Sequence, residues 1–166
     1  MSGTDNTART ATGADLPAIQ TALAYALDWR GEGGWDSPAA LIESSGHAYL
    51  LAGWGKTGDA AVIAVVQDRA VGAAWYRYWS KSLHSYGYID DSTPEIGLGV
   101  DPDYRRQGVG TSLMTALLNL AVEHGVPSLA LSVECDNPAV RLYRNLGFEH
   151  YADVDDAWTM LGRLGS

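Results

Sequence analysis

Residues 100–111 read VDPDYRRQGVGT, and they carry the most information about the fold of this chain. The segment follows a strand-like run at 95–100 and precedes apolar residues at helical spacing, so it predicts a turn from a strand into a helix. Two arginines and two glycines surround the predicted helix start: Arg105, Arg106, Gly108 and Gly110. Free N–H groups at a helix N-terminus bind anions, and arginines add charge-assisted contacts. We interpret the segment as a phosphate-binding loop, with a tight turn that binds nothing as the alternative.

The sequence on both sides of this loop predicts a mixed α/β fold. Apolar and β-branched patterns predict strands at residues 60–66, 70–79, 95–100, 128–134, 148–154 and 158–161. Caps, prolines and a 3.6-residue period predict helices at residues 15–27, 37–44, 111–124 and 138–146. The alternation of strands and helices in the second half is typical of a mixed sheet with helices packed on its faces.

Length and composition predict a flexible tail at residues 1–12 and a single domain at residues 13–166. The chain has 166 residues, of which 46% are hydrophobic, and such a length can bury an ordinary core. The first residues lack an apolar segment, so we expect neither a signal peptide nor an anchor there. One cysteine, Cys135, allows no intramolecular disulfide, which fits a reducing compartment, and we expect a cytoplasmic location. We expect the thiol to be buried, with a partly exposed thiol near the coenzyme as the alternative.

The charge balance and the apolar runs exclude two kinds of partner. The formal net charge is −9, from 20 acidic and 11 basic residues. This charge repels phosphate backbones, so we expect no nucleic-acid partner. The longest strongly apolar run, at residues 60–66, is far shorter than the roughly 20 residues that span a bilayer. We therefore expect no membrane partner.

Two motifs resemble the GCN5-related N-acetyltransferase (GNAT) superfamily. Arg105-x-x-Gly108-x-Gly110 is similar to its acyl-coenzyme A signature, and the residues from Val100 to Arg105 look like the approach to it. Asn137-Pro138-Ala139-x-x-Leu142-Tyr143-x-x-x-Gly147-Phe148 resembles its later motif. The resemblance covers residues 60–160 well. It implies a GNAT-like acyl-CoA N-acyltransferase fold, a central mixed β-sheet flanked by helices. A Rossmann-type dinucleotide site fits less well, because the full G-x-G-x-x-G is absent.

The resemblance implies acetyl-CoA as the acetyl donor and coenzyme A as its product. Amides of residues 107–111 would bind the pyrophosphate, and the strand before them would bind the pantetheine arm. The residues implied in cofactor binding are Leu98, Gly99, Val100, Arg105, Arg106, Gln107, Gly108, Val109, Gly110, Thr111 and Asn137. Asn137 has the alternative role of capping its helix.

The resemblance also implies two catalytic residues. Tyr143 matches a tyrosine that protonates the departing thiolate, a role suited to a phenol, and packing is its alternative. Glu95 begins the strand where many members have a glutamate that takes a proton from the amine, usually through water. An exposed carboxylate, or one that only holds a cationic substrate, is its alternative. Val100 is the candidate for a backbone N–H that meets the developing oxyanion.

Aromatic residues crowd the predicted acceptor side, where cation–π and ionic contacts can hold an ammonium group. The candidates for substrate binding are Trp29, Trp35, Trp75 and Tyr78, and ordinary packing is their alternative. The histidines lack the spacing of metal ligands, so we assign no metal.

The predicted activity is transfer of an acetyl group to a primary amine by direct attack in a ternary complex. A cationic small molecule is slightly favoured as the acceptor over a lysine or N-terminal amine of a protein. The alternatives are a non-catalytic acyl-CoA sensor and a module that only keeps the fold. The family also implies a possible homodimer.

Overall fold

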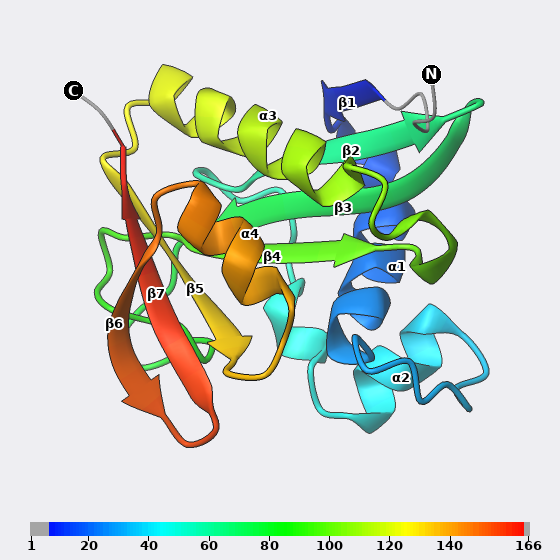
Figure 1. Cartoon of the computed structure of the whole chain (residues 1–166), viewed down its shortest axis with the longest axis horizontal. Helices are drawn as coiled ribbons and strands as arrows, with labels where there is room; N and C mark the ends of the chain where they lie inside the picture. Colours follow the sequence, from blue (N-terminus) through cyan, green and yellow to red (C-terminus); the bar gives the residue numbers. More distant parts are fainter. Residues whose placement is uncertain (1–6, 165–166) are drawn as a thin grey trace. The chain divides into compact units, whose positions relative to one another are not determined.

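The structure, a computed structural model, describes residues 7–164 (Figure 1). Its strands are β1 (Thr7–Thr10), β2 (Ala60–Val66), β3 (Arg69–Arg77), β4 (Glu95–Val100), β5 (Ser128–Glu134), β6 (Glu149–Val154) and β7 (Ala157–Arg163). Its α-helices are α1 (Leu16–Leu27), α2 (Pro38–Ser44), α3 (Val109–Glu123) and α4 (Ala139–Asn145). The strand order is β1-β2-β3-β4-β5-β7-β6, with β4 and β5 parallel and β5 and β7 antiparallel. The predicted mixed sheet with flanking helices is confirmed.

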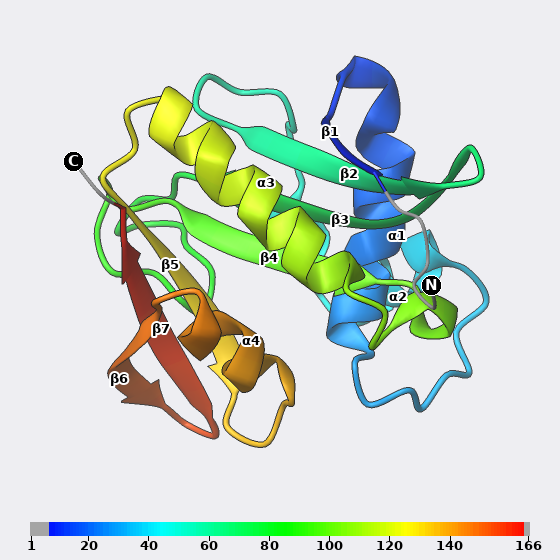
Figure 2. The same ribbon diagram turned by 45° about the horizontal axis from the view of Figure 1, so that its top comes forward.

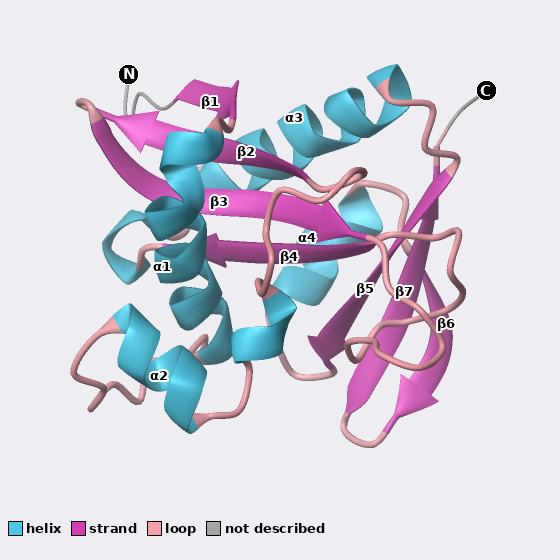
Figure 3. Ribbon diagram, turned by 180° about the vertical axis from the view of Figure 1, so that it is seen from behind, coloured by secondary structure: helices cyan, strands magenta, loops and turns pink. Residues whose placement is uncertain are grey.

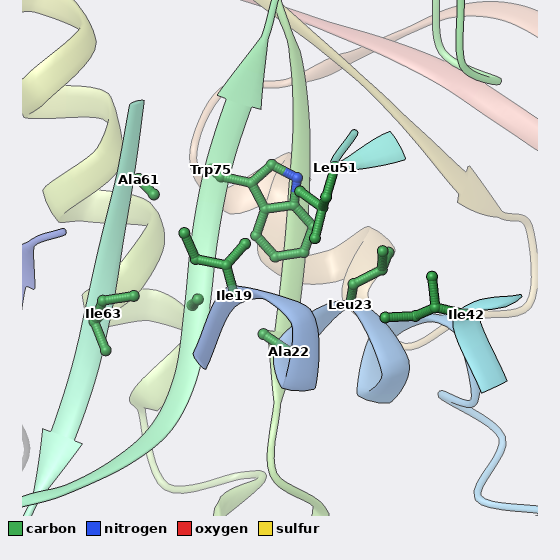
Figure 4. Packing of buried hydrophobic residues seen from close by; sticks show 9 residues of the cluster. Ile19, Ala22, Leu23, Ile42, Leu51, Ala61, Ile63 and Trp75 are labelled. Atoms are coloured by element: carbon green, nitrogen blue, oxygen red, sulfur yellow. The ribbon is translucent and has the colours of Figure 1, made fainter. Parts of the chain in front are cut away.

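The chain forms two compact units, and the first comprises residues up to 75 together with 97–117. In it α1 covers one face of β2 and β3, and the first half of α3 covers the other (Figures 1 and 3). The α1 face is filled by residues that recur at helical spacing, Ile19, Ala22 and Leu23, packed with Ile63 and Trp75 (Figure 4). Burial of such side chains is the main source of the unit's stability.

The second unit comprises residues 76–96 and those from 118 onward. In it β7 pairs with β5 on one side and β6 on the other, and α4 lies over β5 and β7 (Figure 2). A Cβ on Gly162 of β7 would lie 2.7 Å from the ring of Phe148, so only glycine allows this ring to lie against the strand. Phe148 is thereby fixed three residues after the end of α4.

The predicted flexible tail is wrong for part of its length. Thr7–Thr10 form β1, which pairs antiparallel with β2, while residues 1–6 lie outside the described part. β1 is short and polar, and main-chain hydrogen bonds to β2 stabilise it. Its sequence therefore lacks the alternation of apolar and polar residues from which a strand is predicted. Asp15 then fixes the chain direction, because its carboxylate accepts from Arg9 at 2.7 Å and from the N–H of Thr12. The predicted single domain at 13–166 stays a prediction.

Smaller differences concern strand ends and the cysteine. The third strand ends at Arg77 instead of residue 79, and the last strand extends over Ala157–Arg163. Cys135 is exposed, so its predicted burial is wrong. It follows β5 directly, where the chain leaves the sheet.

Candidate functional site

The loop between β4 and α3 is built around the buried carboxylate of Asp101. Its N–H donates to the Val71 carbonyl at 2.8 Å, and its Oδ1 accepts from the N–H of Asp103 at 2.9 Å. Its Oδ2 accepts from Arg69 at 3.1 Å. These bonds fix where the chain leaves β4, and Pro102 starts the 3-10 turn that follows. The aspartate and proline of the sequence motif therefore have a structural purpose.

The start of α3 leaves main-chain donors without helical partners. Its first helical bond runs from the Ser112 N–H to the Gly108 carbonyl at 3.0 Å, so the N–H groups of Val109, Gly110 and Thr111 precede the ladder. Arg106 and Gly108 have φ values of 61° and 83°, which turn the main chain at this point. A Cβ on Gly108 would meet nothing within 4 Å. Open space beside free N–H groups at the positive end of a helix dipole suits an anion.

The two adjacent arginines of this loop differ in their surroundings. Arg105 is half-buried, and its guanidinium donates to the carbonyls of Val100, Trp29 and Tyr25 at 3.2, 3.1 and 3.3 Å. Arg106 is exposed, and no hydrogen bond or ion pair joins it to another of the residues 7–164. Arg106 is therefore the arginine whose donors are all available to a ligand, while Arg105 holds the loop together.

The glycines of β4 make room for the first unit's own packing. A Cβ on Gly99 would lie 1.7 Å from the carbonyl oxygen of Ala22 in α1. A Cβ on Gly97 would lie 2.3 Å from the indole of Trp75. Close packing against Ala22 thus explains why residue 99 is a glycine. The binding of the pantetheine arm by Leu98, Gly99 and Val100 stays a prediction.

Glu95 lies in a buried niche of the second unit. It is 8% exposed, and its neighbour Pro94 accepts the N–H of Ala130 in β5 at 2.9 Å. Its Oε2 accepts from the N–H of Gly87 at 3.1 Å. Its Oε1 is buried and, within the described part of the chain, has no hydrogen-bond partner. A carboxylate with one oxygen that has no hydrogen-bond partner can accept a proton, or a hydrogen bond from a ligand, at that oxygen.

Burial governs the acidity of this carboxyl. Desolvation raises the pKa of Glu95 from 4.5 to about 7, and the Gly87 N–H, the Ser85 hydroxyl and the charge of His84 only partly oppose it. The loop that supplies these groups is wedged against β5, because a Cβ on Gly87 would lie 2.7 Å from the main chain at Leu131. Sequence reasoning missed Ser85 and Gly87, and the glycine was the one available signal.

Tyr143 lies in α4 and is 7% exposed. Its ring meets that of Phe148 edge-on, with centroids 6.1 Å apart. Burial raises the pKa of the phenol well above its ordinary value, so the hydroxyl keeps its proton at neutral pH. Asn137 precedes the same helix, and its Oδ1 accepts from the N–H of Ala139 at 2.9 Å. This bond fits the predicted alternative role of Asn137, which is to cap the helix.

The predicted aromatic residues have different environments. Trp75 is 5% exposed and belongs to the core of the first unit (Figure 4), which is its packing alternative. Trp29 carries the guanidinium of Arg30 over its ring at 4.3 Å, and Trp35 donates its indole N–H to Asp28 at 2.9 Å. Tyr78, in the second unit, is 40% exposed.

Residues 7–164 offer neither a metal centre built from clustered side chains nor a helix that spans a membrane. They contain no group of three or more His, Cys, Asp or Glu side chains arranged to hold a metal ion. None of their helices is both long and apolar enough to cross a membrane.

These features define a class, a mixed α/β protein whose strand-to-helix loop suits an anion. The profile of the Acetyltransferase (GNAT) family matches residues 21–148, so the chain belongs to that family. The structure of the PaiA N-acetyltransferase of Thermoplasma acidophilum in complex with coenzyme A has a similar fold. Its TM-score is 0.68 at 14% identity, over 96% of this chain and 99% of the other.

Two curated relatives are enzymes of different names. The mycothiol acetyltransferase of Corynebacterium aurimucosum is 34% identical over 74% of this chain and 39% of its own length. The [ribosomal protein bS18]-alanine N-acetyltransferase of Escherichia coli (strain K12) is 29% identical over 81% of this chain and 74% of its own length. The chain thus spans less than half the length of the mycothiol acetyltransferases that it matches.

Proposed function

We propose that this protein transfers the acetyl group of acetyl-CoA to a primary amine. The observation that carries the proposal is Glu95, a buried carboxylate with one free oxygen in a chain of the GNAT family. A base is most effective when its pKa lies near the pH at which the enzyme works, so the raised pKa of Glu95 suits proton transfer from an amine at neutral pH. The thioester supplies the activated acetyl group, and the chain supplies placement and proton transfer.

The phosphate loop is proposed to hold the coenzyme. The N–H groups of Val109, Gly110 and Thr111 would donate to the pyrophosphate, and Arg106 would pair with it. The open space beside Gly108 and the unpaired donors support this assignment. The N–H of Val100 is the proposed donor to the thioester oxygen.

Glu95 is proposed as the base. Most amines are protonated at neutral pH, so the acceptor loses a proton before it attacks. Oε1 would accept that proton, directly or through one water, while the Gly87 N–H holds Oε2 in place.

Tyr143 is proposed as the acid that protonates the departing thiolate. The phenol is protonated at neutral pH and so has a proton to give to the thiolate, although burial raises its pKa and makes it a weaker acid. Placement of the two reactants supplies the rest of the rate.

The proposed acceptor is a cationic small molecule, with a protein amino group as the alternative. The net charge of −9 attracts both kinds of acceptor, and the names of the two relatives cover a small molecule and a protein. A cytoplasmic location and a homodimer are further proposals, from the single cysteine and the family resemblance.

The test is release of free thiol from acetyl-CoA with a panel of amines. The panel contains diamines, amino sugars, a peptide with an N-terminal alanine and a lysine peptide. We expect turnover with at least one amine and a loss of a hundredfold or more in Glu95→Gln. Binding of acetyl-CoA without turnover of any amine would favour the sensor alternative, and equal activity of Glu95→Gln would exclude Glu95 as the base.

A further inference from the structure

One carboxylate holds the glycine-rich loop at residues 28–35. Asp28 follows α1, and its oxygens accept hydrogen bonds from three donors of the loop, each at 2.9 Å: the N–H groups of Glu32 and Gly33 and the indole N–H of Trp35. Positive φ values at the glycines let the chain turn back toward Asp28, at Gly31, Gly33 and Gly34. The loop therefore has a defined shape despite its composition.

Arg105 fastens the phosphate loop to the end of α1. Its Nη2 and Nη1 donate to the carbonyls of Tyr25 and Trp29, and its Nε donates to Val100 at the end of β4. Tyr25 lies in the last turn of α1, where carbonyls lack helical partners and a positive charge stabilises the helix dipole. One side chain therefore bonds β4, α1 and the start of the 28–35 loop.

The two anchors act on the same small region. The ring of Tyr25, whose carbonyl accepts from Arg105, meets the ring of Trp35 edge-on at 6.2 Å. The pKa of Asp28 lies below its ordinary value, mainly because of the Trp35 hydrogen bond and to a smaller extent because of the Arg105 charge. The two anchors thus meet at the pair of rings formed by Tyr25 and Trp35.

We propose that Arg105 and Asp28 are positioning residues that couple the phosphate loop to the 28–35 loop, so that coenzyme binding orders the latter for the acceptor. The proposal rests on the proposed function, which places the coenzyme at the phosphate loop, and on the prediction from the sequence that Trp29 and Trp35 bind the acceptor. An anion held at residues 106–111 restrains the backbone of Arg105, which restrains the carbonyls of Tyr25 and Trp29. By linkage, a bound acceptor then strengthens coenzyme binding by the same factor.

Hydrogen exchange measured by mass spectrometry tests the coupling without a known acceptor. In the wild-type protein, saturating coenzyme A should slow the exchange of the Glu32 and Gly33 amides roughly tenfold, because their bonds to Asp28 open less often. Arg105→Gln should abolish this slowing. Arg106→Gln, the adjacent control, should weaken coenzyme binding but keep the slowing once coenzyme A is saturating.

Two further variants separate coupling from a loss of folding. Asp28→Ala removes both acceptors, so it should exchange rapidly at both amides with and without coenzyme A, while its far-ultraviolet spectrum stays that of the wild type. Arg105→Lys keeps the charge but cannot reach three carbonyls, so it should behave like Arg105→Gln. Once an acceptor is known, both Arg105 variants should raise its KM about tenfold more than they raise the KM of acetyl-CoA.

The outcomes distinguish this proposal from the proposed function. If coenzyme A binds and slows exchange equally in the wild type and in Arg105→Gln, the coupling proposal is wrong and the proposed function stands. The coupling proposal is also wrong if coenzyme A binds the wild type without slowing exchange. If coenzyme A does not bind the wild-type protein at all, both are wrong.

Discussion

The phosphate loop and the Glu95 niche are built on opposite principles. The loop offers main-chain donors that lie within one stretch of sequence, at residues 101–111, with open space beside Gly108. The niche depends on one side chain whose pKa is set by burial and by donors eight to ten residues away in the sequence, at Gly87 and Ser85. A site made of local main chain leaves a motif in the sequence. A site made by desolvation leaves only an ordinary glutamate.

The largest expected effect is on the loop. Gly108→Glu should abolish coenzyme A binding, by at least about a thousandfold, because it adds a negative charge where phosphate belongs. The measurement is a calorimetric titration. Gly125→Glu is the matched control, since Gly125 also has a positive φ and open space around it, and it should bind coenzyme A normally. Normal affinity in Gly108→Glu would overturn the loop assignment.

The next largest effect comes from a substitution in the Glu95 niche, and it should change turnover without changing coenzyme binding. Glu95→Gln keeps the shape but removes the base, so kcat should fall about a hundredfold to ten-thousandfold while the affinity for acetyl-CoA stays the same. The wild-type kcat should rise with pH through about 7, because the ionised carboxyl is the active form. The variant should lack this limb. Glu123→Gln, an exposed glutamate in α3, is the control and should leave kcat unchanged.

A smaller effect is expected for the phenol. Tyr143→Phe should lower kcat about tenfold to a hundredfold, since a thiolate leaves more easily than most groups, and should leave the affinity for coenzyme A unchanged. Steady-state kinetics with a saturating acceptor measures it. A variant with full kcat would assign Tyr143 to packing against Phe148 alone.

A further expected effect, on stability alone, isolates the burial of Glu95. Its pKa is about 7 in the folded protein and 4.5 in the unfolded chain, so the folded state holds the proton more tightly. The stability that this provides is present in full below pH 4.5 and is lost as the pH rises through 7. The wild type should therefore lose about 3 kcal/mol more than Glu95→Gln between pH 4.5 and 8.5 in urea unfolding. Parallel curves would contradict a buried, desolvated carboxyl.

Most elements could be predicted from the sequence because their signals are local. The hairpin of β2 and β3 follows from two apolar runs around Gln67 and Asp68, which both adopt the positive φ that tight hairpins require. Pro38 and Ser37 mark α2, and the Ser37 hydroxyl accepts from the N–H of Ala40 as a cap should. β1 could not be predicted, because its partner strand is more than fifty residues away in the sequence and its own residues are polar.

The candidate site was predictable only where a motif contained it. The positions of Arg105 and Arg106 were evident, but their different surroundings depend on the carbonyls of Tyr25 in α1 and of Trp29 after it, which are 80 and 76 residues away in the sequence. Gly99 looked like a place for a ligand, whereas the close neighbour is the main chain of Ala22. The acidity of Glu95 depends on three-dimensional burial, which no spacing in the sequence records.

Titration of the wild-type protein with coenzyme A, acetyl-CoA and NAD, followed by thermal shift, tests the central claim most directly. A ligand that binds only the folded state raises the melting temperature, and a concentration 100 times the Kd provides about 2.7 kcal/mol. We predict a rise with both coenzyme A forms, no rise with NAD, and no rise with any ligand in Gly108→Glu. No shift of the wild type at millimolar coenzyme A would contradict the account.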